Sequence, residues 1–267
     1  MKAVFLFLIL FVCIFSPCFA KNEWIFLPEF DTGISTILYK EPKLMQESGT
    51  MYSLNCSLTE RFNSDIFMRE EIRYSYGLLN YDGSTWSGTP LTITDIPDYL
   101  IELRWIFGND IPSFGSSFFT PYLGFGYRFL SDNSQLRGSG GYKREANYRY
   151  NPLGVEFTAP INKASSWGAV FEYDAFMWGR QMSYLSDADP TYHDSLNLQK
   201  SGSGYRVSLN YSFRPDMIEF EIRLFEIFWD IAQSEPADLT KNGVNIGYVY
   251  EPKNISTEIG LSLCMKY

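Results

Sequence analysis

Apolar and polar residues alternate with a period of two along much of this 267-residue chain. Over 205–213 the odd positions read Tyr, Val, Leu, Tyr and Phe, and the even positions between them read Arg, Ser, Asn and Ser. Over 119–129 the odd positions read Phe, Pro, Leu, Phe, Tyr and Phe. Successive side chains of a strand point to opposite faces, so each segment has one apolar and one polar face. The pattern predicts amphipathic β-strands.

Ten segments follow this pattern. They span 28–40, 50–62, 66–76, 98–107, 119–129, 146–158, 166–178, 205–213, 218–224 and 253–267. The alternation slips near Phe225, which is compatible with a β-bulge there.

The connections between these segments alternate in length. The connections over 63–64, 109–116, 159–165 and around 215–216 are short, those over 78–96, 131–145, 179–202 and 231–252 are long, and 41–49 is intermediate. An even number of strands with short turns at one end and long loops at the other predicts an all-β fold, an antiparallel up-and-down transmembrane β-barrel of ten strands. A soluble β-sandwich also has one apolar face per strand. The aromatic last residue, the loop asymmetry and the charged residues opposite the apolar ones count against it.

The N-terminal segment has the order of a secretory signal. Lys2 precedes the apolar run 3–15, and Ser-Pro-Cys-Phe-Ala follows, with a cleavage site expected after the small residue Ala20. Thirteen apolar residues are too few for a permanent helical span, which needs about 20. We therefore predict a signal peptide over 1–20 and a single outer-membrane barrel domain over 21–267. Lipidation at Cys18, as in a lipoprotein, is an alternative that the residues before it match poorly.

The net charge, the cysteines and the single histidine restrict the classes of function that are possible. The formal net charge is −9, which argues against a nucleic-acid partner. Cys56 and Cys264 fall on opposite faces of their strands, so no disulfide is expected between them. His193 is the single histidine, which rules out multi-histidine metal sites. We predict no metal and no cofactor.

The polar faces of the segments carry both signs of charge and are predicted to line the lumen. The lumen-lining candidates are Arg69, Glu71, Arg73, Glu102, Arg104, Arg128, Glu172, Asp174, Arg206, Glu219, Glu221, Arg223 and Glu258. A ten-stranded barrel leaves a narrow interior, because eight strands are just filled by side chains. One interpretation is a network of ion pairs that fills the lumen. The other is a narrow, selective pore for small solutes.

The connection over 179–202 holds a cluster of ionisable residues: Asp187, Asp189, His193 and Asp194. An acidic, solvated loop explains it. Acid–base chemistry by Asp187, Asp189 and His193 at the rim of the barrel is the alternative.

The last segment ends in the pattern of a barrel-closing strand, with Gly260, Leu263, Met265 and the terminal Tyr267 as the assembly signal. The chain resembles the bacterial outer-membrane β-barrel proteins, and its strand number and outer loops are similar to those of the omptins, which are ten-stranded surface proteases. The resemblance implies a place in the outer membrane of a Gram-negative bacterium, contact with its lipid and lipopolysaccharide, and insertion by the barrel-assembly machinery. Omptins imply paired acidic residues facing an Asp/His pair at the outer rim. Here 78–96 contains no Asp-x-Asp, and the segment 166–178 is followed by Gly-Arg-Gln.

The function expected from these features is that of a non-enzymatic surface or envelope protein with a narrow charged lumen, whose loops meet an extracellular ligand. We predict no catalytic residues. A small-solute, porin-like channel and a rim hydrolase of omptin type are the alternatives.

Overall fold

The computed structural model describes residues 25–62, 65–85, 87–138 and 140–266. The predicted signal peptide and Tyr267 lie outside the described residues. Among the described residues, no helix is long and apolar enough to cross a membrane.

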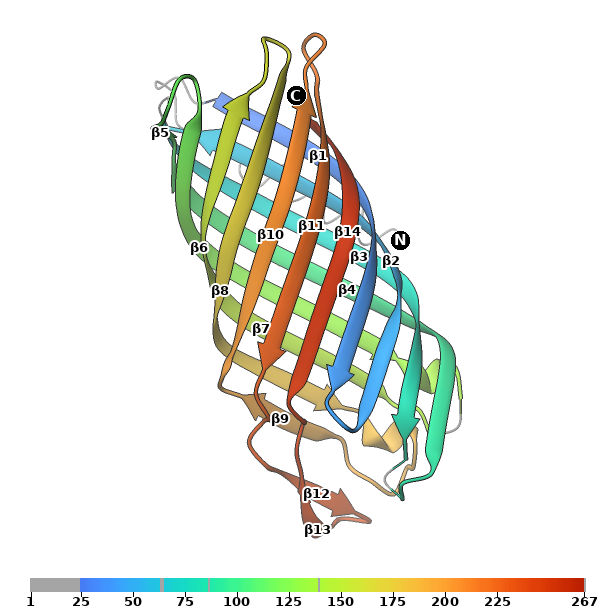
Figure 1. Cartoon of the computed structure of the whole chain (residues 1–267). Helices are drawn as coiled ribbons and strands as arrows, with labels where there is room; N and C mark the ends of the chain where they lie inside the picture. Colours follow the sequence, from blue (N-terminus) through green and yellow to red (C-terminus); the bar gives the residue numbers. More distant parts are fainter. Residues whose placement is uncertain (1–24, 63–64, 86, 139, 267) are drawn as a thin grey trace.

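Ten long antiparallel strands close into a barrel (Figure 1). They are β1 (Ile25–Glu41), β2 (Met45–Arg61), β3 (Ile66–Ser84), β4 (Pro90–Asn109), β6 (Phe118–Asn133), β7 (Lys143–Pro160), β8 (Ser165–Ser183), β10 (Gly202–Phe213), β11 (Glu219–Ile231) and β14 (Asn254–Lys266). Each pairs with its neighbour along the chain, β8 pairs with β10, β11 pairs with β14, and β14 pairs with β1. The predicted fold class is confirmed.

Seven of these strands are much longer than a bilayer requires. β1 to β8, leaving out the two-residue β5 (Ile111–Pro112), have 16 to 20 residues each, whereas about 9–11 residues suffice to span a membrane. The prediction of a long loop over 78–96 was wrong, because β3 continues to Ser84 and β4 begins at Pro90. The physical reason is that outward positions beyond the bilayer, such as Asn80 and Asp82, face water, so the alternation fades while the strand persists.

The two ends of the barrel differ. The connections between β2 and β3, β4 and β6, β7 and β8, and β10 and β11 lie at one end, which we call the turn end. Short turns face the periplasm in barrels of this class. The opposite end, the outer end, carries the connections 184–201 and 232–253.

The two longest outer connections fold against each other into an extension of the barrel. β9 (Ser195–Gln199) pairs with the end of β8, and β12 (Ala237–Lys241) forms a hairpin with β13 (Val244–Val249). Asn197 Nδ2 donates hydrogen bonds to the carbonyl oxygens of Glu235 and Val249, at 3.1 and 3.0 Å. The hairpin forms the tip at the bottom of Figure 1.

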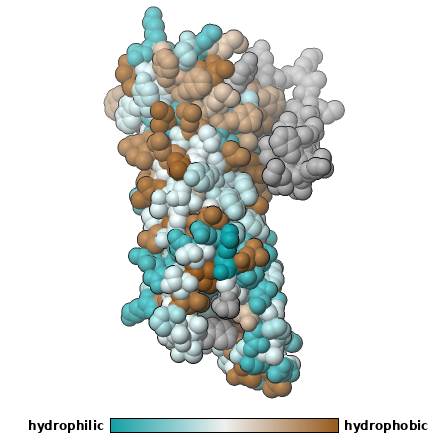
Figure 2. Space-filling model, turned by 90° about the vertical axis from the view of Figure 1, so that its right-hand side faces the viewer, coloured by the Kyte–Doolittle hydropathy of each residue, from teal (hydrophilic) through white to brown (hydrophobic). Residues whose placement is uncertain are grey.

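The outside of the barrel has an apolar belt. On β14 the outward residues Ile259, Leu261, Leu263 and Met265 are all exposed. Figure 2 shows hydrophobic side chains gathered mainly in the upper part of one face, toward the turn end. Nearer the outer end the outward positions turn polar, and on β11 they include Glu226. The belt marks the part of the barrel that lies in lipid.

The β-bulge suggested near Phe225 is absent from β11. This strand keeps an unbroken register with both neighbours from Glu219 to Ile231. The polarity of the faces reverses instead: beyond Phe225 the inward positions become apolar, as at Trp229, and Glu226 points outward. The described pairing of β7 with β8 shifts between Arg149 and Tyr150.

Candidate functional site

Arg206 on β10 lies at the centre of a buried network of charges in the lumen. Its guanidinium pairs with Glu102 on β4 and, at 2.9 Å, with Asp174 on β8. Glu172 lies 3.1 Å from Arg206 Nε and also pairs with Arg104 on β4. The three carboxylates are at most 3% exposed. Each therefore has the cationic partner that a buried charge requires.

Two tyrosine hydroxyls add hydrogen bonds to this network. Tyr150 Oη donates to Glu102 at 2.8 Å, and Tyr122 Oη donates to Glu172 at 2.7 Å. Tyr150 lies on β7 and Tyr122 on β6, the two strands between β4 and β8 in the sheet. The network therefore links five consecutive strands, from β4 to β10, through side chains in the lumen.

A second arm of the network lies on the side of β14. Arg73 on β3 pairs with Glu258, which also accepts a hydrogen bond of 2.7 Å from Ser35 Oγ. Arg128 is 2% exposed, and its guanidinium carbon lies 5.5 Å from the Trp229 ring centroid. The central network thus sets four arginines against four carboxylates: Arg73, Arg104, Arg128 and Arg206 against Glu102, Glu172, Asp174 and Glu258.

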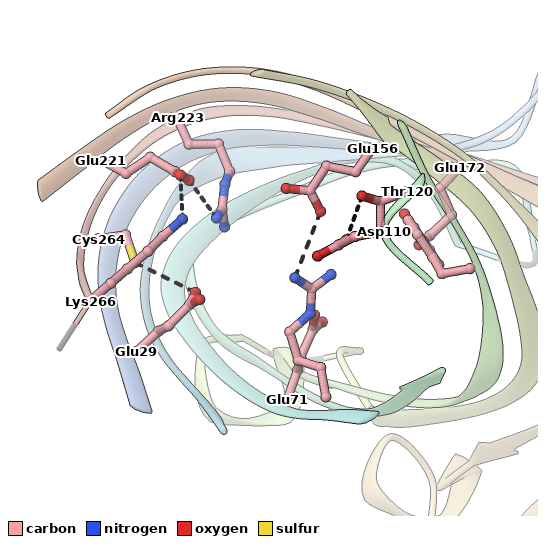
Figure 3. Close-up of polar contacts among 12 residues, drawn as sticks. Glu29, Glu71, Asp110, Thr120, Glu156, Glu172, Glu221, Arg223, Cys264 and Lys266 are labelled. Carbon is pink, nitrogen blue, oxygen red and sulfur yellow. Dashed lines mark hydrogen bonds and ion pairs between the residues drawn. The ribbon is translucent and has the colours of Figure 1, made fainter. Parts of the chain in front are cut away.

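A polar cavity of about 190 Å³ lies between this network and the turn end. Side chains from several strands point into it (Figure 3). Glu221 accepts a hydrogen bond of 2.6 Å from Lys266 Nζ and pairs with Arg223 at 2.7 Å. Across the lumen, Arg69 Nη1 lies 3.8 Å from Glu156. Here too both signs of charge are present and paired.

On the other side of the network an apolar layer crosses the lumen. Trp229 is 1% exposed and packs edge-on against Tyr150, with ring centroids 5.0 Å apart. Tyr148, Ile227 and Ile231 belong to the same cluster. A second cluster consists of Ile37, Met51, Leu79 and Leu100, and Leu130 packs against both clusters. We call these two clusters the apolar layer.

Beyond the apolar layer, at the outer end, the balance of charge changes. Arg144 on β7 lies 2.9 Å from Glu41, 2.8 Å from Asp132 and 3.4 Å from Glu47. Carboxylate oxygens of Glu47, Asp98 and Asp132 all lie within 4.8 Å of one another. These three residues lie on β2, β4 and β6, so no short sequence motif contains them.

Glu251, just before β14, adds a further carboxylate to this group. Tyr39 Oη donates to Glu251 at 3.2 Å and to Glu41 at 3.3 Å. Burial, and next the Glu41 carboxylate, raise the pKa of Glu251 to about 8, although Arg144 opposes the shift. We call Glu41, Glu47, Asp98, Asp132 and Glu251 the acidic mouth; among the described residues, Arg144 is their one ion-pair partner.

The structure places all thirteen lumen candidates on the inward faces of their strands. Besides those described above, Arg104 Nη1 lies 2.7 Å from Glu71, and Glu219 lies 3.7 Å from Lys266. Cys56 and Cys264 are both free. Gly260, Leu263 and Met265 lie in β14, which pairs with both β11 and β1.

The ionisable residues predicted in the connection 179–202 lie in the outer extension. The Asp187, Asp189 and Asp194 carboxylates accept hydrogen bonds from the backbone N–H groups of Lys143, Thr191 and Ser186, respectively. Asp189 also pairs with Lys241 of β12 at 3.3 Å. His193 is exposed, and its backbone N–H donates to the Thr240 carbonyl oxygen at 3.0 Å. These carboxylates fix the shape of the loop.

Comparisons with known proteins bear on the fold. No family model matches the chain, and no curated protein matches its sequence. Among solved structures, the outer membrane protease OmpT from Escherichia coli is similar with a TM-score of 0.61 at 10% identity, over 93% of this chain and 99% of that chain. The toluene transporter TodX from Pseudomonas putida gives a TM-score of 0.37 at 9% identity, over 93% and 90%. Neisserial surface protein A gives 0.31 at 12% identity, over 92% and 100%.

The likeness to OmpT, together with the closed sheet and the apolar belt, defines the class of this protein. It is a ten-stranded β-barrel protein of the outer-membrane type with an omptin-like layout. At 10% identity the likeness concerns the fold alone.

Proposed function

We propose that this chain is a non-conducting, non-enzymatic surface protein of the outer membrane. The observation that carries the proposal is the occluded lumen: the central network and the apolar layer cross the barrel one above the other. Trp229, Tyr150 and Ile231 of the apolar layer are each at most 1% exposed. A continuous solute path would have to pass between these side chains.

Single-channel recording tests this proposal. Refolded protein, with a closed barrel verified by a heat-modifiability gel, is inserted in a planar bilayer. We expect no discrete openings. Salt-dependent openings altered by Glu221→Gln or Arg223→Gln would overturn the proposal in favour of a pore.

The non-enzymatic part of the proposal rests on the loop geometry. The Asp189 carboxylate accepts hydrogen bonds from the N–H and Oγ1 of Thr191, at 3.0 and 2.7 Å. Those bonds favour a structural role over acid–base work with His193. A hydrolytic activity that is abolished by His193→Ala, and retained by the turn-end variant Arg214→Ala, would contradict this part.

The folded outer extension is the part that we propose to contact an extracellular partner. Val244, Ile246 and Tyr248 alternate along β13 and are 63, 53 and 66% exposed. An exposed apolar stripe of this kind suits contact with an extracellular partner.

Cells that display the protein can be tested for adhesion to immobilised extracellular proteins and glycans. Serine at positions 244, 246 and 248 is expected to abolish whatever adhesion the wild type gains over cells without the protein. Leu136→Ser, at another exposed outer position (64% exposed), is the matched control and should keep it. Adhesion by the wild type that survives the triple change would contradict the role of the stripe.

We also propose contact with lipopolysaccharide at the outer edge of the belt. Arg149 on β7 and Arg180 on β8 point outward from adjacent strands, with Arg149 opposite Trp178 and Arg180 opposite Asn147, and the Arg149 guanidinium lies 4.2 Å from the Trp178 ring centroid. Arginine suits phosphate groups. The double variant R149Q/R180Q should bind lipopolysaccharide micelles at least about tenfold more weakly. Arg214→Gln, at the turn end, should bind them as the wild type does; equal binding by all three proteins would contradict the contact.

A further inference from the structure

Three carboxylates of the acidic mouth converge on one point. Glu47, Asp98 and Asp132 each contribute an oxygen to a group in which no two atoms are more than 4.8 Å apart. Two oxygens bound to the same Ca²⁺ at about 2.4 Å lie no further apart than about 4.8 Å. The separations therefore fit a single ion held between β2, β4 and β6.

The hydrogen bonds of these residues leave one oxygen of Glu47 and one of Asp98 free. Arg144 occupies Oε2 of Glu47 and Oδ2 of Asp132, and the Ser134 N–H donates to Oδ1 of Asp132 at 2.9 Å. Oε1 of Glu47 and Oδ1 of Asp98 are buried and have no hydrogen-bond partner. Glu47 is itself only 3% exposed. A buried carboxylate oxygen without a donor is costly, and a cation in the group would satisfy it.

The surrounding charge also favours a cation. Among the described residues, Arg144 is the one ion-pair partner of the five carboxylates of the acidic mouth, so protons or a cation must neutralise the others. The central network, by contrast, is balanced. Carboxylate oxygens are hard ligands that suit Ca²⁺ or Mg²⁺ rather than softer metals.

We propose that Glu47, Asp98 and Asp132 form a binding site for one divalent cation of the calcium class at the outer mouth of the barrel. The remaining ligands are waters that enter from the outer end, since three carboxylates alone do not complete the six to eight oxygens of Ca²⁺. The ion ties three strands together above the membrane. This site stands independently of whether the barrel conducts.

Calorimetric titration with CaCl₂ tests the site. The refolded full-length protein, treated with chelator and dialysed, is expected to bind one Ca²⁺ per barrel. Glu47→Gln and Asp98→Asn, which keep the size of the side chain, should each weaken binding at least about tenfold, because the number of charged ligands sets calcium affinity. Asp82→Asn, an exposed outer carboxylate on β3 outside the group, is the matched control and should leave binding unchanged.

A second readout covers variants that refold poorly. Ca²⁺ should raise the thermal unfolding midpoint of the wild type and of Asp82→Asn, but not that of Asp98→Asn. Absence of binding to Ca²⁺ and Mg²⁺ by the wild type would overturn the proposal. So would equal affinity in Asp98→Asn, or binding of a polyamine such as spermidine in place of the metal.

Discussion

The lumen holds two groups of buried carboxylates that differ in one respect. In the central network four arginines face four carboxylates, and Glu102, Glu172, Asp174 and Glu258 each have an arginine partner. In the acidic mouth Arg144 pairs with three of the five carboxylates, and among the described residues the other two, Asp98 and Glu251, have no ion-pair partner. The apolar layer around Trp229 separates the two groups.

Because the central network and the acidic mouth differ in their balance of charge, we infer different roles for their carboxylates. In a balanced, buried network the attraction between opposite charges offsets the cost of removing them from water. An excess of buried carboxylates destabilises the fold unless protons or a cation compensate it. On the function proposed above, the central network acts as a structural plug, and on the proposed cation site the acidic mouth takes a ligand.

The largest effect is expected from removing the centre of the plug. Arg206→Met leaves Glu102 and Asp174 without their main partner, and breaking a buried pair costs about 3–5 kcal/mol. The free energy of unfolding, from urea titration in detergent, should fall by that amount. An unchanged midpoint would mean that the central network does not hold the barrel closed.

Trp229→Ala is expected to cost about 3 kcal/mol or more, because it removes a large side chain from a packed layer. Urea titration in detergent measures the loss. Phe228→Ala, next to it on β11 but facing outward, is the control and should lose less stability. Equal losses in the two variants would show that Trp229 does not belong to a tightly packed layer.

The smallest effect is expected at an exposed ion pair. Arg214 pairs with Glu219 at 2.7 Å at the turn end, but its side chain is 60% exposed. Arg214→Met should lower the free energy of unfolding by less than about 1 kcal/mol. A loss as large as that of Arg206→Met would show that burial is not what distinguishes the network.

The sequence was most informative where the barrel crosses lipid. There a strand has lipid on one face and a narrow lumen on the other, so the alternation over 205–213 and 253–267 marked both the strands and the inward charges such as Arg206 and Glu258. The same contrast made the alternation seem to shift by one residue at Phe225 and Glu226. β11 is regular there, but its inward face enters the apolar layer and its outward face leaves the lipid.

The acidic mouth escaped prediction for two reasons. Glu47 and Asp132 fell in stretches taken for connections, because strands that project into water lose their alternation on the outer face. The group is also assembled from β2, β4 and β6 and from Glu251, which are distant in sequence. The sequence did offer one signal: single acidic residues stand at or near the ends of four predicted strands, at positions 41, 47, 98 and 132.

The most direct test of the contrast between plug and mouth is one conservative change made in each. Urea unfolding midpoints are measured for Glu102→Gln and Asp98→Asn in chelator-treated buffer at pH 8. We predict that Glu102→Gln lowers the midpoint, because Arg206 loses its partner. Asp98→Asn should raise it, because it removes an acid whose ionisation in the folded barrel is opposed first by burial and then by Glu47 and Asp132. A similar fall in both variants would contradict the account.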